Sequence, residues 1–201
     1  MGFDLYGNNP KIKQGTKRPE QIDYETATQE EKEAYFKAVD EFENENRGVY
    51  FRNNVWWWRR LADYVCEHTK CVDKKDFASW QHNDGHEVDE ETAIQIANQL
   101  EYLIKTGHAE EYIKEVEKEK EEARLHNSKV DKLMEELKAK VAKETGKDIE
   151  NTAPSEYPAK YNKEWWDIIN QKDYRDQYPF AISNVKEFIE FARNSGGFKI
   201  C

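Results

Sequence analysis

The spacing of apolar residues predicts a helix that begins near residue 28. Phe36, Val39 and Phe42 recur at helical intervals, so they would share one face of that helix. Thr28 is followed three residues later by Glu31, which is the spacing of a capping box, in which each side chain accepts a hydrogen bond from the other residue's backbone. We therefore expect Thr28 to be the N-cap of this helix.

A second amphipathic pattern predicts a helix after Asp89, which is placed to be its N-cap. Val88 precedes the cap and would form the outer half of a hydrophobic staple. Gly107 is expected to end the helix, because glycine readily adopts the left-handed conformation of a C-terminal cap. The apolar positions of this pattern are Ala93, Ile96, Ala97, Leu100, Leu103 and Ile104.

The stretch YFRNNVWWWRRLADY, residues 50–64, is unusually rich in tryptophan and arginine. We expect a central helix from about residue 53 to residue 68, with Trp58, Leu61 and Val65 on its inner face. Adjacent residues of a helix are rotated by about 100°, so the three consecutive tryptophans cannot share that face.

A second face of this predicted helix would bring Arg52, Trp56 and Arg59 together. A guanidinium stacked on an indole can bind a base, an aromatic ligand or a partner side chain. The same residues also fit an ordinary arginine–tryptophan stack with an Arg–Asp pair at the surface, and the sequence leaves both interpretations open.

Residues 109–146 are rich in Glu and Lys and have apolar residues at every seventh position, namely Val116, Ala123, Val130 and Leu137. Such heptads are typical of a coiled-coil-like helical arm. The triplet at residues 126–128, His-Asn-Ser, also suits a turn, so an antiparallel helical hairpin is an alternative to one long helix.

The C-terminal part of the chain predicts two more helices and a strand. Residues 165–169 suggest a short buried helix, and Ser183 is placed to be the N-cap of a last helix. The apolar tail FKIC is expected to be held in the core by pairing with the opening segment FDLYG as a minimal sheet.

These elements predict a mainly α protein with a compact helical body and a projecting charged helical arm. The body would be formed by residues 1–108 and 147–201, with the pairing of the two termini as its small β component. Residues 109–146 would be the arm, either one helix or a helical hairpin.

Charge and composition change the expected partners. The formal net charge is −10, which disfavours direct binding to nucleic acid or to an anionic membrane. No apolar run reaches the ~18 to 20 residues of a membrane span, and the N-terminus lacks a signal-peptide pattern, so we expect a cytoplasmic protein. The odd number of cysteines suits reduced thiols.

One set of residues resembles a zinc site. Cys66, Cys71, His82 and His86 lie close along the chain, and the two histidines have the H-x3-H spacing of zinc ligands. However, the two cysteines are separated by four residues rather than two, and Cys66 follows Val65, which is expected in the core. We therefore expect no metal and no cofactor, and zinc at these residues is an alternative.

The segment Asn83-Asp84-Gly85 is a strong turn signal before a helix, whose N-terminus can bind an anion. Asp84, His86 and Glu87 could hold a metal ion or transfer protons, although a turn and a cap explain these residues without a ligand. The chain contains no G-x-S-x-G, H-E-x-x-H or phosphate-loop motif. No catalytic residue is assigned, and a non-enzymatic role is favoured.

Four segments together resemble a family of small uncharacterised proteins from bacteria and bacteriophages: MGFDLYG, YFRNNVWWWRRLADY, NDG and YPFAISNVKEFIEFARNSGGFKIC. The resemblance covers about half of the chain and implies no activity. It implies that residues 16–47 are an insertion, because relatives often pass almost directly from the opening segment to the tryptophan block. Relatives commonly have a cysteine-rich insert instead of the charged arm, and often Asp instead of His86. These differences weaken zinc at His82 and His86 but leave Asp84 in the shared pattern.

The resulting hypothesis is a non-catalytic binding protein, a phage or prophage accessory factor that engages a host protein, a second copy of itself or a small nucleotide-like ligand. Its predicted site consists of Arg52, Asn53, Trp56, Arg59 and Asp84. One alternative is a metal-dependent enzyme that acts on phosphorylated or nucleotide substrates. Another is an acidic mimic of nucleic acid that inhibits a nucleic-acid-binding host protein.

Overall fold

The computed structural model describes residues 2–201, which divide into two compact units. Unit 1 contains the chain up to Ile113 together with Pro179–Cys201, and unit 2 is Lys114–Tyr178. Helices account for 62% of the chain, and the rest of the regular structure is a small antiparallel sheet. Residues 147–178, which we expected in the body, thus cluster with the charged helix in unit 2.

The elements have the following bounds. The α-helices are α1 (Gln29–Glu45), α2 (Val55–His68), α3 (Glu90–Lys105), α4 (His108–Thr145), α5 (Ala159–Ile169) and α6 (Ile182–Asn194). The strands are β1 (Gly2–Gly7), β2 (Tyr50–Asn54), β3 (His86–Val88) and β4 (Phe198–Ile200). Short 3-10 helices span Lys74–Asp76, Ser79–Gln81, Ile149–Asn151, Pro154–Glu156 and Tyr174–Gln177.

The sheet of unit 1 has the strand order β2-β1-β4-β3, and all neighbouring strands are antiparallel. The predicted pairing of the two termini is confirmed, with Leu5 opposite Ile200. The sequence did not predict β2 or β3. Alternate residues of the strands point to opposite faces, and the buried face carries Phe3, Leu5, Phe51, Phe198 and Ile200.

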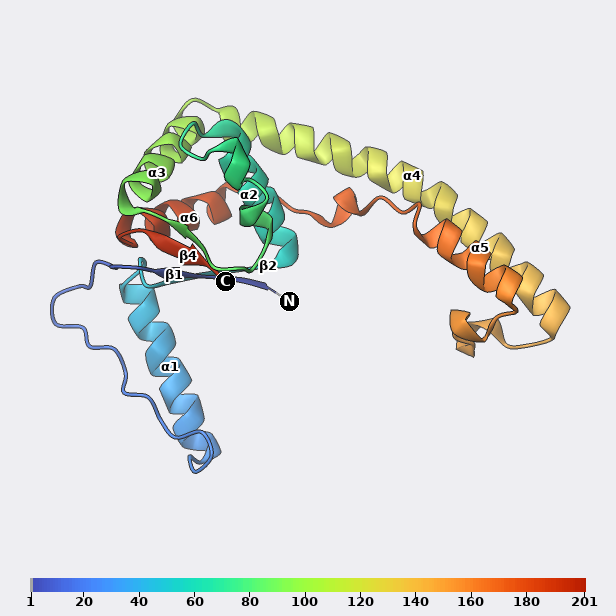
Figure 1. Cartoon of the computed structure of the whole chain (residues 1–201), viewed down its shortest axis with the longest axis horizontal. Coiled ribbons are helices and arrows are strands. Elements are labelled where there is room, and N and C mark those ends of the chain that lie inside the picture. Colours follow the sequence, from blue (N-terminus) through green and yellow to red (C-terminus); the bar gives the residue numbers. More distant parts are fainter. Residues whose placement is uncertain (1) are drawn as a thin grey trace. The chain divides into compact units, whose positions relative to one another are not determined.

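Helices α2, α3 and α6 lie on the buried side of the sheet (Figure 1). Trp58 of α2 is fully buried and stacks on Phe3 and Trp80, with ring centroids 5.4 Å and 6.0 Å apart. Its indole Nε1 donates a 2.7 Å hydrogen bond to the carbonyl oxygen of Trp80. The inner position predicted for Trp58 is therefore confirmed.

The central helix begins later than we expected. The side chain of Asn54 accepts hydrogen bonds from the backbone N–H groups of Trp56 and Trp57, so Asn54 is the N-cap. Arg52 and Asn53 belong to β2 instead of the helix. The helical face predicted to run from Arg52 through Trp56 is therefore wrong at its N-terminal end.

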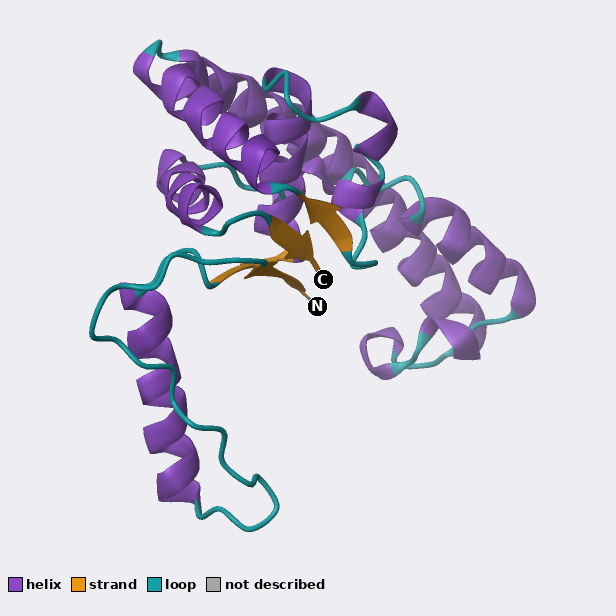
Figure 2. Cartoon of the chain, turned by 60° about the vertical axis from the view of Figure 1, so that its left-hand side comes forward, coloured by secondary structure: helices purple, strands orange, loops and turns teal. Residues whose placement is uncertain are grey.

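Helix α1 begins at the predicted capping box, since both hydrogen bonds between Thr28 and Glu31 are present. It projects away from the sheet on the side opposite α2, α3 and α6 (Figures 1 and 2). Phe42 is its one buried residue, whereas Phe36 is 52% exposed. The predicted apolar stripe is thus covered only near the C-terminal end of α1.

The caps of α3 and α6 differ in how well they were predicted. The Asp89 side chain accepts a hydrogen bond from the Thr92 N–H, which confirms Asp89 as the N-cap of α3. Ser183 is not the N-cap of α6. The N–H of Val185 donates to the carbonyl oxygen of Ala181, so helical bonding begins two residues earlier, with Ala181 as the N-cap.

α4 is one continuous helix, most of which belongs to unit 2, so the hairpin alternative is wrong. The residues predicted as a possible turn, 126–128, instead contact residues 171–173. The Asn127 side chain accepts a 2.9 Å hydrogen bond from the N–H of Asp173, and His126 Nε2 lies 2.7 Å from the Gln171 carbonyl oxygen. One hydrophobic cluster of this unit consists of Val130, Leu137, Val141, Ile149, Tyr157 and Ile168. Trp166 of the predicted buried helix α5 is 54% exposed.

Candidate binding groove

The free edge of β2 is the first feature of the candidate site. β2 is an edge strand whose one neighbour is β1. The N–H of Gly7 donates to the carbonyl oxygen of Val49 at 3.0 Å. Because such bonds alternate along an antiparallel pair, the backbone groups of Phe51 face β1, whereas those of Tyr50 and Arg52 face the free edge.

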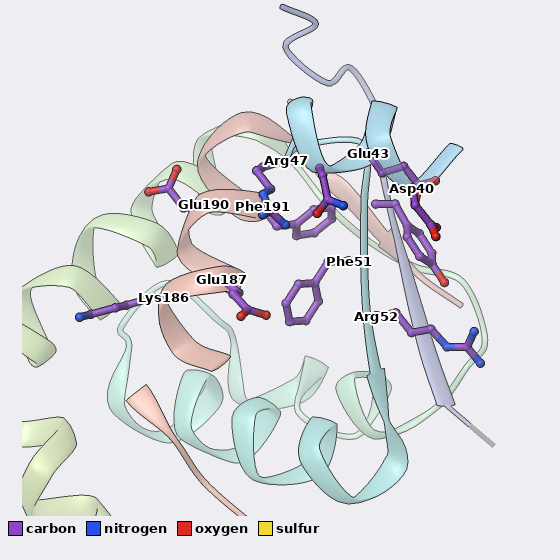
Figure 3. Close-up of a pocket in the computed structure, with 11 residues that line it drawn as sticks. Asp40, Glu43, Arg47, Phe51, Arg52, Lys186, Glu187, Glu190 and Phe191 are labelled. Atoms are coloured by element: carbon purple, nitrogen blue, oxygen red, sulfur yellow. The ribbon is translucent and has the colours of Figure 1, made fainter. Parts of the chain in front are cut away.

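A pocket of about 430 Å³ lies along this edge, between the C-terminal part of α1 and α6 (Figure 3). Arg52 lines it from the outer face of the sheet and Phe51 from the inner face, so the pocket passes around the edge of β2. The rings of Phe51 and Phe191 stack 5.7 Å apart and form its floor. We call this pocket, bounded by Asp40, Glu43, Arg47, Arg52, Glu187 and Phe191, the edge groove.

Two close contacts fix β2 against α6 and so define one wall of the groove. An added Cβ at Gly48 would lie 2.0 Å from the carbonyl oxygen of Asn194, so only glycine lets the end of α6 approach there. At the other end of β2, the side chain of Asn53 donates a 3.1 Å hydrogen bond to the side chain of Asn184. The predicted site residue Asn53 therefore positions the strand.

The rim of the groove carries charges of both signs, with more acids than bases. Its acids are Asp40, Glu43, Glu187 and Glu190, and its bases are Arg47, Arg52 and Lys186. Among residues 2–201, none of the four carboxylates forms an ion pair with a basic side chain. These carboxylates can therefore pair with basic groups of a partner, although Arg18 already attracts Glu43 at longer range.

The surroundings of Glu43 oppose the ionisation of its carboxyl group. Partial burial raises its pKa, and the negative charge of Asp40 raises it further, whereas the positive charge of Arg18 acts in the opposite direction. A positive group bound beside Glu43 and Asp40 would relieve this repulsion, which favours a cationic ligand at this side of the groove.

On the outer face of the sheet, Asp4 organises the residues beside the groove. Its carboxylate accepts a hydrogen bond from the Tyr50 hydroxyl and lies 3.5 Å from Nε of Arg52. Burial and this hydrogen bond raise the pKa of Tyr50, so its hydroxyl remains protonated at neutral pH. The Tyr6 ring packs against Tyr50 at 5.3 Å, and this packing holds the Tyr50 side chain at the groove.

The structure does not bring all five predicted site residues together. Arg52 lines the edge groove, whereas the side chain of Asn53 forms the hydrogen bond to Asn184 of α6. Trp56 is 37% exposed in the first turn of α2, and Arg59 is exposed one turn further along. Asp84 is exposed in the turn before β3, at the opposite edge of the sheet from β2.

Sequence reasoning missed the acids of the groove and its aromatic floor. α1, β2 and α6 are far apart in the chain and meet only in the tertiary structure, so no local motif joins Glu43, Phe51 and Glu187. The alternation within YFRNN, in which Phe51 is buried and Arg52 exposed, was the one local signal of a strand.

The alternative zinc residues do not form a metal site. Within residues 2–201, no group of three or more His, Cys, Asp or Glu side chains is placed to hold one metal ion. Cys66 is buried in α2, where burial raises the pKa of its thiol to about 12. His82 Nδ1 lies 2.7 Å from the carbonyl oxygen of Ala78, so this ring nitrogen is engaged with the backbone.

Comparison with known proteins found no matching family model, no matching curated protein and no matching solved structure. None of the helices formed by residues 2–201 is long and apolar enough to cross a membrane.

Proposed function

We propose that this protein is a non-catalytic binding protein whose partner occupies the edge groove. The observation that supports this proposal is the position of the pocket, which joins an unpaired strand edge, an aromatic floor and carboxylates without ion-pair partners. Binding sites combine apolar contact area with a few polar groups that fix orientation. The edge groove has both kinds of surface at one place.

The charge of the groove favours a protein partner over a nucleotide-like ligand. Four carboxylates line the rim, and Arg52, one of its three bases, is already held by Asp4. A phosphate group would be repelled by the acids, whereas a basic side chain would be attracted. The proposed role as a phage or prophage accessory factor is a separate part of the proposal, supported by the sequence resemblance alone.

Selection of short random peptides on the full-length protein tests the proposed site. The affinity of the recovered peptides is then compared for wild type, Glu187→Lys and Glu41→Lys. Glu41 lies on α1 next to the groove residue Asp40 but does not line the groove. The two substitutions change the net charge equally, so Glu41→Lys controls for long-range electrostatics.

We expect Glu187→Lys to weaken binding about tenfold or more, since it reverses a charge inside the groove, and Glu41→Lys to change it by less than about twofold. Equal effects of the two substitutions, or recovery of no binding peptide, would contradict the proposal. A nucleotide added to the same assay should not displace the peptides.

A further inference from the structure

We infer that the partner binds to β2 as an additional β-strand, and that it is an extended basic peptide segment with an apolar side chain. This inference rests on the proposed function, because it concerns the same groove. It adds the conformation and the chemical class of the partner, which the proposed function does not specify.

Within residues 2–201, the backbone of β2 has hydrogen-bonding groups that no neighbouring strand uses. The N–H and C=O groups of Tyr50 and Arg52 face the free edge, and no strand of the described chain lies beside them. An extended peptide can pair with such groups, and main-chain hydrogen bonds then provide affinity. The edge groove runs along these two residues, so a peptide in the groove would lie next to them.

The side chains of the groove are also arranged to receive an added strand. Successive side chains of an added strand would point alternately to the two faces of the sheet. On the inner side they would meet Phe51, Phe191 and Glu187 (Figure 3). On the outer side they would meet Tyr50, Glu43 and Arg52, the last of which is paired with Asp4. An apolar side chain fits above the aromatic floor, and basic side chains fit beside the carboxylates.

The charge of the surrounding elements selects a basic segment. α1, which forms the outer wall, has seven carboxylates and two lysines. The rim residues of α6 add a net negative charge on the other side of the groove, because Lys186 offsets only one of the two acids Glu187 and Glu190. A basic peptide would therefore gain electrostatic attraction from both walls, and its binding should weaken as salt is added.

The same charges disfavour a second copy of this chain on the edge. Pairing of two β2 edges would place the acidic α1 of each copy near the groove acids of the other. Like charges brought together at an interface oppose association. A basic partner has no such penalty, which is why we assign the edge to a peptide of a different protein.

Amide hydrogen exchange of the full-length protein, free and saturated with a recovered peptide, tests strand addition. The amides of Tyr50 and Arg52 should exchange fast in the free protein and at least about tenfold more slowly in the complex. The amide of Phe51, which faces β1, is the internal reference and should change little.

Backbone N-methylation of the peptide provides a second measurement. Methylation of a peptide residue whose N–H faces β2 should abolish binding. Methylation of the residues between them should change the affinity by less than about twofold, because both antiparallel and parallel pairing use the N–H groups of alternate residues. The recovered peptides should also be enriched in Lys and Arg around an apolar residue.

Each contradictory result has a separate meaning. Peptides that are sensitive to Glu187→Lys but leave the Tyr50 and Arg52 amides unprotected would overturn strand addition and retain the proposed function. Peptides insensitive to Glu187→Lys would overturn both. Slow exchange of the two amides in the free protein, together with a dimeric mass, would overturn the inference and assign the edge to a second copy.

Discussion

At the residue scale, the three consecutive tryptophans have different environments. Trp58 is fully buried between Phe3 and Trp80, whereas Trp56 is 37% exposed. Periodicity alone was sufficient to predict this difference, because it depends only on the 100° rotation between helical neighbours. The functional role predicted for Trp56 stays a prediction.

Substitution of these tryptophans should separate stability from surface effects. Trp58→Ala should lower the free energy of unfolding by about 3 to 5 kcal/mol, because it removes a fully buried indole and its hydrogen bond to Trp80. Trp56→Ala should lower it by less than about 1 kcal/mol. Denaturant unfolding measures both values, and equal losses would contradict the assignment of Trp58 to the core.

The N-cap of α3 should give the protein a defined acid dependence. The backbone N–H and hydroxyl of Thr92 donate hydrogen bonds to the Asp89 carboxylate and lower its pKa. A carboxyl group with a lowered pKa in the folded state stabilises the fold above its unfolded pKa, about 3.9 for Asp. This contribution is lost as the pH falls through the folded-state pKa.

Asp89→Asn tests this dependence, because asparagine is a neutral N-cap. At neutral pH the substitution should cost about 0.3 to 1 kcal/mol, the contribution of a negative charge at a helix N-terminus. The difference from wild type in urea unfolding should shrink as the pH is lowered below 4. A difference that is independent of pH would show that the charge of Asp89 contributes nothing.

At the element scale, the sequence predicted the helices better than the strands. The capping box at Thr28 and the cap at Asp89 were recognisable because their hydrogen bonds join residues three positions apart. β2 and β3 are five and three residues long, and their partners are distant in the chain. Nothing local to such short segments identifies the strand with which they pair.

The missed strand also explains why the structure separates the residues of the predicted site. The sequence predicts a helix that begins near Asn53 and continues the face of Arg52, whereas α2 starts at Val55. In β2 they point to opposite faces, so Arg52 reaches Asp4 and the groove, whereas Asn53 reaches α6. The identity of Arg52 as a candidate site residue could be predicted from sequence, but its neighbours could not.

At the scale of the whole molecule, the chain divides into two compact units, and unit 2 has a hydrophobic cluster of its own. The predicted heptad positions Val130 and Leu137 are buried in unit 2, against Tyr157 and Ile168. The heptads indicated an apolar seam on α4 but not what covers it. The covering residues lie about 20 or more positions away in the chain, and their pairing with α4 depends on tertiary structure.

Leu137→Ala tests whether the two units are independent. It should destabilise unit 2 by about 2 to 5 kcal/mol, because the leucine is fully buried in the core of that unit. Hydrogen exchange should accelerate in residues 114–178, while the affinity of recovered peptides for the edge groove in unit 1 stays within about twofold of wild type. Loss of peptide binding would show that the site requires unit 2.

Filling the edge groove is the most direct test of its role in binding. Asn44 lines the groove from α1 and is exposed, so Asn44→Trp should fill part of the groove without disturbing the core. Asn44→Ala is the matched control, because it changes the same residue without filling the space. We expect Asn44→Trp to weaken peptide binding at least about tenfold with an unchanged melting temperature, and Asn44→Ala to bind like wild type. Undiminished binding by a folded Asn44→Trp protein would contradict the assignment of the site to the edge groove.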